Sequence, residues 1–283
     1  MLVKIIAAID DSFTRFTFFN NIQNAARQKL SLLKRNIGYH PRFDTPDKVI
    51  DYYRDLPDMN GPFTDDFIKA RRFQAKTYWN HIFRNEIDFI NSLYGTWVPV
   101  FEANATYTAE RNLLTIPPAM MYSPLFALGG PPEINYGALG RFMTHYIMRG
   151  YDQHGLRFDG AGALSPWFSQ ENQHRYDALI SCMERMALTA PGNRFRALTW
   201  DEVLPDVLGS ISVLNAYKKA KGQPGPSDKL FYVSWCLLWC GRQSGPSDDF
   251  RCNLPLMNSD HFKDTFACPY NSPMNPAHKC NFW

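Results

Sequence analysis

The stretch "RFMTHYIMRGYDQHG", residues 141–155, combines a helical pattern with part of a metal-binding motif. Across residues 136–151 apolar side chains recur at helical spacing, which predicts a helix. On that helix, His145 lies where the H-E-x-x-H zinc motif places its first ligand. The motif requires an acid directly afterwards and a second His four residues on, but these positions hold Tyr146 and Arg149. The stretch therefore predicts a helix with an incomplete zinc motif.

Composition limits the class of protein. The chain has 283 residues, 45% of them hydrophobic and 20% charged, which suits a globular protein with a full core. Lys plus Arg number 30 against 27 Asp plus Glu, and no basic stripe is present, so we expect no nucleic-acid partner. No apolar run reaches the roughly 18 residues of a transmembrane helix. The N-terminal stretch lacks the pattern of a signal peptide because Asp10 and Asp11 interrupt it.

The cysteines indicate an oxidising compartment. They include no C-x-x-C pair, so neither a zinc ribbon nor a thioredoxin-type site is expected. Disulfides are therefore expected, and buried free thiols are the alternative. The six are Cys182, Cys236, Cys240, Cys252, Cys268 and Cys280.

Helical segments precede mixed ones along the chain. Apolar positions at helical spacing predict helices over residues 1–36 and 64–93, separated by a stretch rich in Pro and Asp. The segments 96–107 and 112–121 have the β-branched and aromatic content of short strands. We therefore expect a mainly α (α+β) fold with a small sheet.

Several segments carry a family resemblance. In order and spacing they are similar to the catalytic lobe of the neprilysin and endothelin-converting-enzyme family of zinc metallopeptidases. The resemblance implies a gluzincin-type lobe across residues 1–283, with the sheet beside the helix at 136–151. It also implies that the family's N-terminal capping lobe is absent from this chain. The segments are "INYGALGRFMTHYIMRGYDQHGLRFDGAGALSPWF" (134–168), "DEVLPDVLGSISVLNAYKKA" (201–220), "LFYVSWCLLWCG" (230–241), "FACPYNSPMNPAHKCNFW" (266–283) and "NATYTAERNLLTIPPAMMYSPLF" (104–126).

Part of the family's zinc site matches this sequence. The resemblance implies that His145 takes the place of the first zinc ligand and Glu202 that of the third. Asp206 takes the place of the Asp that supports a ligand His. The second ligand has become Arg149 and the catalytic Glu has become Tyr146.

Other family positions concern substrate and transition state. The His that stabilises the tetrahedral intermediate falls near Gly245. The resemblance implies that Asn104 and Ala105 bind substrate backbone, and that Arg251 is the family's substrate-binding and structural Arg. These matches predict that the binding cleft is kept although the chemistry is lost.

We predict that zinc is absent and that an ion pair replaces it. Two remaining ligands fall short of the three that catalytic zinc sites use, and Arg149 would place a permanent charge beside the metal. No cofactor is therefore expected. The guanidinium of Arg149 is predicted to hold Glu202 in two hydrogen bonds, because an unpaired buried carboxylate is costly. The alternative is that Arg149 reaches solvent while Glu202 caps its own helix in a box with Thr199.

Other retained residues also allow simpler interpretations. Asp206 is compatible with a solvated helix position, and Pro205 is expected to bend the helix and displace both carboxylates. Asn104 opens "NAT", the chain's only N-glycosylation sequon, although a strand inside a cleft would be poorly accessible.

The resemblance also bears on the disulfides. It implies that Cys182 pairs with Cys280, and that the partners of Cys240 and Cys268 lie in a segment outside this chain. Cys236 and Cys252 are additions to the family pattern and are expected to pair with each other.

Two functions follow from these matches. The favoured one is an inactive pseudopeptidase that binds a peptide or protein through the residual cleft, with a separate capping lobe or chain as a further partner. The alternative is an active zinc metalloendopeptidase, and a gene copy without function is not excluded. By resemblance the protein is expected to be extracellular or part of an ectodomain.

Overall fold

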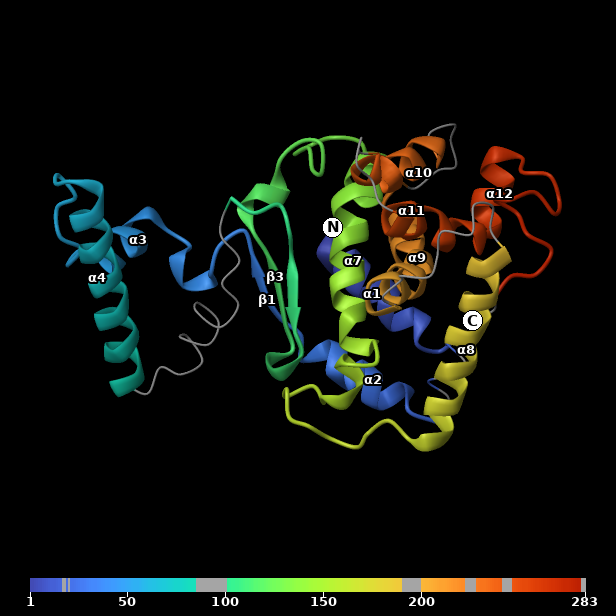
Figure 1. Ribbon diagram of the computed structural model, residues 1–283, viewed down its shortest axis with the longest axis horizontal. Helices are drawn as coiled ribbons and strands as arrows, with labels where there is room; N and C mark the ends of the chain where they lie inside the picture. The colour runs from blue at the N-terminus through green and yellow to red at the C-terminus, as the bar shows by residue number, and fades with distance from the viewer. Residues whose placement is uncertain are drawn as a thin grey trace.

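The computed structural model describes residues 1–16, 19, 21–84, 101–189, 200–221, 228–240 and 246–280. Helices dominate this part of the chain, and a three-stranded sheet lies beside them (Figure 1). The helices are α1 (Leu2–Ser12), α2 (Gln23–Ser31), α3 (Pro46–Tyr52), α4 (Phe63–Phe83), α6 (Pro132–Asn135), α7 (Arg141–Met148), α8 (Gln170–Thr189), α9 (Trp200–Lys221), α10 (Asp228–Cys236), α11 (Pro246–Met257) and α12 (Asp260–Phe266). The strands are β1 (Lys34–Ile37), β2 (Thr106–Thr108) and β3 (Leu113–Ile116). The predicted mainly α class is confirmed.

Helix α7 runs through the core, and a π turn (Tyr136–Gly140) leads into it. The side chains of its predicted apolar stripe are buried, except that of Tyr146, which is half-buried. Helix α9 crosses α7 closely, because Gly209 has no side chain to hold the two apart. A Cβ added to Gly209 would lie only 2.7 Å from Cγ2 of Thr144. This close crossing brings polar residues of both helices to one point.

The sheet has the order β1-β3-β2. Strand β1 runs parallel to the central strand β3, and β2 runs antiparallel to it. Leu113, Leu114 and Ile116 of β3 are buried, so the central strand anchors the sheet in the core. The sheet lies alongside α7, as the family resemblance implied (Figure 1).

The helix predicted over residues 1–36 is wrong in two places. Helix α1 ends at Ser12, and the aromatic residues that follow pack on Tyr151, with Phe13 at 4.9 Å between ring centroids. The last part of the segment is not helical but forms β1. Its hydrogen bonds go to β3, some 80 residues away in the chain, and no local pattern reveals such a partner.

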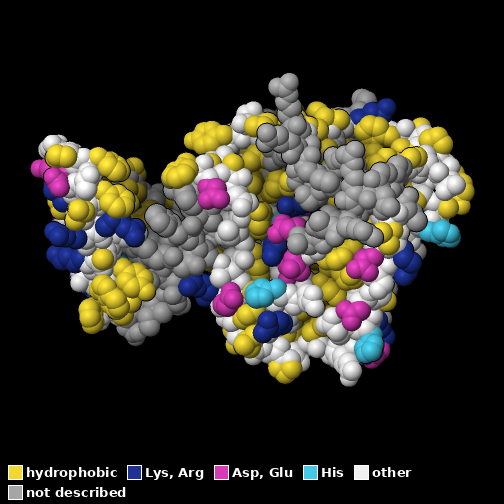
Figure 2. Space-filling model, viewed as in Figure 1, with side chains coloured by type: hydrophobic (Ala, Val, Ile, Leu, Met, Phe, Trp, Pro, Cys, Tyr) yellow, Lys and Arg dark blue, Asp and Glu magenta, His cyan; other side chains and the backbone are white. Residues whose placement is uncertain are grey.

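Helices α3 and α4 lie at the far side of the sheet from α7 (Figure 1). Neither helix contains a buried residue, and Figure 2 shows hydrophobic side chains among basic ones on their surface. Helix α4 confirms the prediction over 64–93 as far as Phe83, and residues 85–93 lie outside the described part. Of the strand predicted over 96–107, only Thr106–Thr108 is a strand in the described residues.

Two disulfides tie the C-terminal part together. Cys182 of α8 is joined to Cys280 in the C-terminal tail, as the resemblance implied, and Cys236 at the end of α10 is joined to Cys252 of α11. Cys240 and Cys268 have free thiols. None of the helices in the described ranges is both long enough and apolar enough to span a bilayer.

Candidate functional site

His145 and Asp206 meet where α7 crosses α9. Both side chains are 1% exposed, and Nδ1 of His145 lies 3.0 Å from Oδ1 of Asp206. Burial lowers the pKa of His145 although Asp206 opposes the shift, so the ring is neutral at pH 7. With Asp206 ionised, the proton lies on Nδ1 and leaves the lone pair of Nε2 facing Glu202. This is the orientation in which a His can serve as a metal ligand.

Asp206 is the best-paired group of the site. Its second oxygen, Oδ2, lies 2.8 Å from Nε of Arg251 and 3.1 Å from Nη2 of Arg141. Burial raises its pKa, but the positive charges of Arg141 and Arg251 outweigh burial and hold the pKa well below its usual value. The interpretation of Asp206 as a solvated residue is therefore wrong. The neighbouring Pro205 does not displace it, because α9 continues through the proline from Trp200 to Lys221.

The predicted ion pair between Arg149 and Glu202 is present. Nη1 of Arg149 donates to Oε1 of Glu202 at 2.7 Å. Two details of the prediction are wrong: Glu202 is 43% exposed instead of buried, and only one of its oxygens faces Arg149. The other oxygen, Oε2, lies 3.1 Å from Nη1 of Arg251 and 3.7 Å from Nε2 of His145. The proposed capping partner Thr199 lies outside the described residues.

Pro205 gives Arg149 a second acceptor. In an α-helix the N–H of residue 205 would bond to the carbonyl of residue 201, but proline has no N–H. Nη1 of Arg149 donates to this carbonyl of Asp201 at 3.1 Å. The guanidinium thus pairs with a carboxylate and satisfies the backbone group that the proline leaves open.

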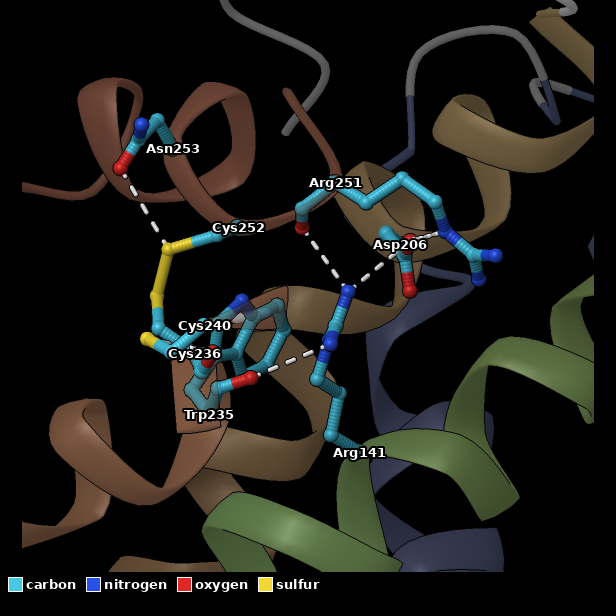
Figure 3. Close-up of a disulfide and its surroundings, with 8 residues drawn as sticks. All are labelled: Arg141, Asp206, Trp235, Cys236, Cys240, Arg251, Cys252 and Asn253. Carbon is cyan, nitrogen blue, oxygen red and sulfur yellow. Dashed lines mark hydrogen bonds and ion pairs between the residues drawn. A yellow bond between two sulfur atoms is a disulfide. The ribbon is translucent and has the colours of Figure 1, made fainter. Parts of the chain in front are cut away.

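Arg141 links the site to α10 and α11 through backbone hydrogen bonds. Nη1 donates to the carbonyl of Trp235 at 3.1 Å and Nη2 to the carbonyl of Arg251 at 2.8 Å (Figure 3). These two carbonyls directly precede Cys236 and Cys252, the cysteines of one disulfide. The guanidinium also lies 4.7 Å from the ring of Trp235, a cation–π contact.

Together these groups form a chain of alternating charge. In order, and each within 4 Å of the next, it runs Asp152, Arg149, Glu202, Arg251, Asp206 and Arg141. Three carboxylates balance three guanidinium groups, and His145 is neutral, so the site is electrically neutral without a metal. Sequence reasoning missed Arg141 and Asp152. One signal was available for Arg141: it lies four residues before His145, which lies four before Arg149, on one stripe of the helix.

Tyr146 contacts the start of the sheet. Its hydroxyl donates to Oδ1 of Asn104, the residue two positions before β2, and burial raises the pKa of Tyr146 to about 12. Asn104 is exposed, contrary to the expectation that it would be inaccessible, whereas the side chain of Ala105 is buried in the core. Gly245 lies outside the described residues.

The residues present do not fit a zinc ion. Among the residues that the structure describes, three atoms face the position a metal would need, and each already has a guanidinium nitrogen close by. Oε1 and Oε2 of Glu202 have the contacts given above, and Nε2 of His145 lies 3.4 Å from Nη2 of Arg251. A catalytic zinc site needs three protein ligands and an open position, and two fixed cations repel the dication. In the part of the chain that the structure describes, no group of three or more His, Cys, Asp or Glu residues could hold a metal.

Comparison with known proteins shows the family of this chain. The model of peptidase family M13 matches residues 104–282, which include all six residues of the charge chain. The chain belongs to peptidase family M13. Among curated M13 relatives, Neprilysin-11 of Caenorhabditis elegans is 30% identical over 208 residues, which cover 64% of this chain and 24% of that protein. Human Endothelin-converting enzyme-like 1 is 26% identical over 92% of this chain and 36% of the relative.

Solved structures share the fold. A structure titled Haemonchus galactose containing glycoprotein complex matches with a TM-score of 0.77 at 17% identity, over 100% of this chain and 48% of that one. The Mycobacterium tuberculosis zinc metalloprotease in complex with an inhibitor matches with a TM-score of 0.70 at 18% identity, over 100% of this chain and 46% of that one. The chain spans less than half the length of the relatives named here.

Proposed function

We propose that the chain is a non-catalytic member of peptidase family M13, which holds no zinc and binds a peptide or protein over the former metal site. One observation carries the proposal: in the described part of the chain, the atoms of His145 and Glu202 that face the metal position already contact guanidinium groups. The site is neutral as it stands, so zinc would add two uncompensated charges. Tyr146 also lacks the carboxylate that would activate a metal-bound water.

The ligand would meet an accessible part of the site. Asn104 is exposed and Glu202 is 43% exposed, so a peptide can reach both side chains. Ala105 is only 1% exposed, so its backbone is not accessible to a ligand in this structure. Arg251 is 13% exposed and committed to Asp206 and Glu202. We therefore assign Arg251 a structural role and the contact with the ligand to Asn104 and Tyr146.

Catalysis is tested with a quenched-fluorescent peptide library. The purified chain, incubated with zinc and the library, should show no cleavage that a chelator abolishes. Cleavage that is lost both with chelator and in the Glu202→Gln variant would overturn the proposal and establish the alternative, an active zinc metalloendopeptidase.

Binding is tested by selection from phage-displayed random peptides on the full chain secreted to a bacterial periplasm. Selected peptides should bind about tenfold more weakly to Tyr146→Ala, the loss typical of an aromatic anchor. The matched control Tyr270→Ala removes an exposed tyrosine that is not part of the site. Selected peptides whose binding is equal in both variants would refute the assigned surface.

We further propose an extracellular location and a capping partner. Disulfides persist in oxidising compartments, and the described residues contain two. Helix α4 exposes aromatic side chains, among them Phe63 and Phe83, each 82% exposed. This apolar face suits a further lobe or chain of the kind that makes up the remaining length of the relatives. A complex purified from native tissue and analysed for its subunits tests this partner.

A further inference from the structure

We propose that Asn104 is an N-glycosylation site and that its glycan covers the edge of β2 that has no partner strand in the described sheet, next to the proposed former metal site. Asn104, Ala105 and Thr106 form the chain's only N-x-Ser/Thr sequon. The modification does not depend on the proposed function, but the effect of the glycan on ligand binding rests on it.

Asn104 has the exposure that a glycan requires. Residues 101–104 are all exposed, and Asn104 lies two residues before β2, an edge strand of the described sheet. The amide is oriented by Tyr146, whose hydroxyl donates to Oδ1. Glycosylation takes place on Nδ2, the other atom of the planar amide, and it leaves the carbonyl oxygen in place. The hydrogen bond with Tyr146 is therefore compatible with a glycan.

Thr106 supplies the hydroxyl of the sequon, and the fold makes no use of it. In the described part of the chain, Oγ1 of Thr106 is buried and has no hydrogen-bond partner. An unpaired buried hydroxyl destabilises a fold, so packing alone would favour an apolar side chain here. The sequon requires the hydroxyl while the chain is still extended, before the strand is buried.

The reaction is a glycosyl transfer from a lipid-pyrophosphate-linked oligosaccharide. Nδ2 of Asn104 forms a bond to the anomeric carbon of the first sugar and loses a proton. The bond between that carbon and the phosphate oxygen breaks, and the lipid pyrophosphate leaves with the electron pair. The donor and the transferase belong to the secretory pathway, in which disulfides such as Cys182–Cys280 also form.

The experiment expresses the full chain in a eukaryotic secretory host and compares its mobility before and after digestion with peptide-N-glycosidase. Wild type should shift, and the enzyme should convert Asn104 to Asp, which peptide mass spectrometry detects. Thr106→Ala should lose the shift although Asn104 remains, whereas Thr106→Ser should keep it. Both variants change the strand at position 106, but only Thr106→Ala removes the sequon, so the comparison shows which of the two effects prevents glycosylation.

A positive control makes a negative result decisive. Pro62→Thr creates a second sequon at Asn60, in an exposed stretch before α4. If Pro62→Thr is glycosylated at Asn60 while Asn104 stays unmodified, the proposal is overturned.

The covering role is tested with the peptides that the unglycosylated protein selects. They should bind Thr106→Ala from the secretory host more tightly than glycosylated wild type. Equal binding to both proteins, with Asn104 occupied, would refute the covering role alone. Failure to select any peptide concerns the proposed function and leaves the mobility test intact.

Discussion

At the scale of single residues, the two carboxylates of the proposed former metal site differ in burial. Asp206 is 1% exposed and contacts two arginines and His145, whereas Glu202 is 43% exposed. Breaking a buried, paired charge leaves its partners uncompensated, but solvent screens an exposed pair. The two residues should therefore contribute very differently to stability.

We predict that Asp206→Asn lowers the free energy of unfolding by about 3–5 kcal/mol. Glu202→Gln should lower it by about 1 kcal/mol or less. Urea denaturation of the two variants beside wild type measures both. Equal losses would contradict the assignment of Asp206 as the residue that holds the site together.

The residues of the site differ in how far the sequence predicts them. The pairing of Arg149 with Glu202 follows once the fold brings two family positions together. The role of Arg251 in joining Glu202 to Asp206 depends on side-chain geometry across α9 and α11, and the sequence does not contain it. Arg141 was detectable from its helical spacing before His145, but its partners at Trp235 and Arg251 were not.

At the scale of elements, Pro205 and Arg149 couple α9 to α7. Arg149 supplies the donor that Pro205 lacks, to the carbonyl of Asp201. When Arg149 is removed and Pro205 is kept, this carbonyl loses its donor. When residue 205 is an alanine, its backbone N–H can donate to the carbonyl instead. A double-mutant cycle isolates this effect.

We predict that Arg149→Met costs less stability in Pro205→Ala than in wild type, by about 1 kcal/mol, the net value of one hydrogen bond. The free energies of unfolding of the four proteins give the coupling. A coupling near zero would mean that the contact between Arg149 and Asp201 does not stabilise the fold.

The junction of α9, α10 and α12 should respond to pH. Asp228 lies 2.6 Å from Nζ of Lys221 and 3.4 Å from Nε2 of His261. Burial raises the pKa of Asp228, but hydrogen bonds from Lys221 and Tyr217 outweigh burial and lower it. A lowered pKa means that the stabilisation is present above the unfolded value of about 4 and is lost as the pH falls through the folded one.

We predict that Asp228→Asn destabilises the protein at pH 7 and that the difference from wild type shrinks as the pH falls below about 4. Urea denaturation at several pH values measures it. A difference that grows on acidification would contradict the charge interaction.

The elements show why local patterns predict helices better than strands. The apolar stripe of α7 is a property of its own sequence, so the helix was predicted correctly. The helical pattern extends into β1, because the strand pairs with β3, some 80 residues further along the chain, and leaves no local signal of this pairing. The break after Ser12 likewise depends on the packing of Phe13 and Phe19 against the distant ring of Tyr151.

At the scale of the whole molecule, disulfides limit the freedom of the C-terminal half. The bond between Cys182 and Cys280 closes a sequence separation of 98, and that between Cys236 and Cys252 one of 16. Replacing both cysteines of the longer pair by Ser should lower the free energy of unfolding by about 4–5 kcal/mol, and of the shorter pair by about 3 kcal/mol. Urea denaturation under non-reducing conditions measures both losses. A larger loss for the shorter pair than for the longer one would contradict the explanation that the disulfides stabilise the fold by reducing the entropy of the unfolded chain.

The central claim is that guanidinium groups have taken the place of zinc. The variant that tests this claim most directly is Tyr146→Glu with Arg149→His. It rebuilds the H-E-x-x-H pattern from His145 to position 149 and leaves His145 and Glu202 unchanged. The family resemblance implies that Gly245 stands near the place of the His that stabilises the intermediate. Peptidase activity should therefore return only weakly, because one such donor is typically worth about a hundredfold in rate.

The measurement is the zinc content of the wild type and of this double variant after dialysis against zinc-containing buffer. We predict background zinc in wild type and about one zinc per chain in the variant, whose His145, His at 149 and Glu202 would form the three-ligand set of a catalytic site. Stoichiometric zinc in wild type, lost in Glu202→Gln, would contradict the account.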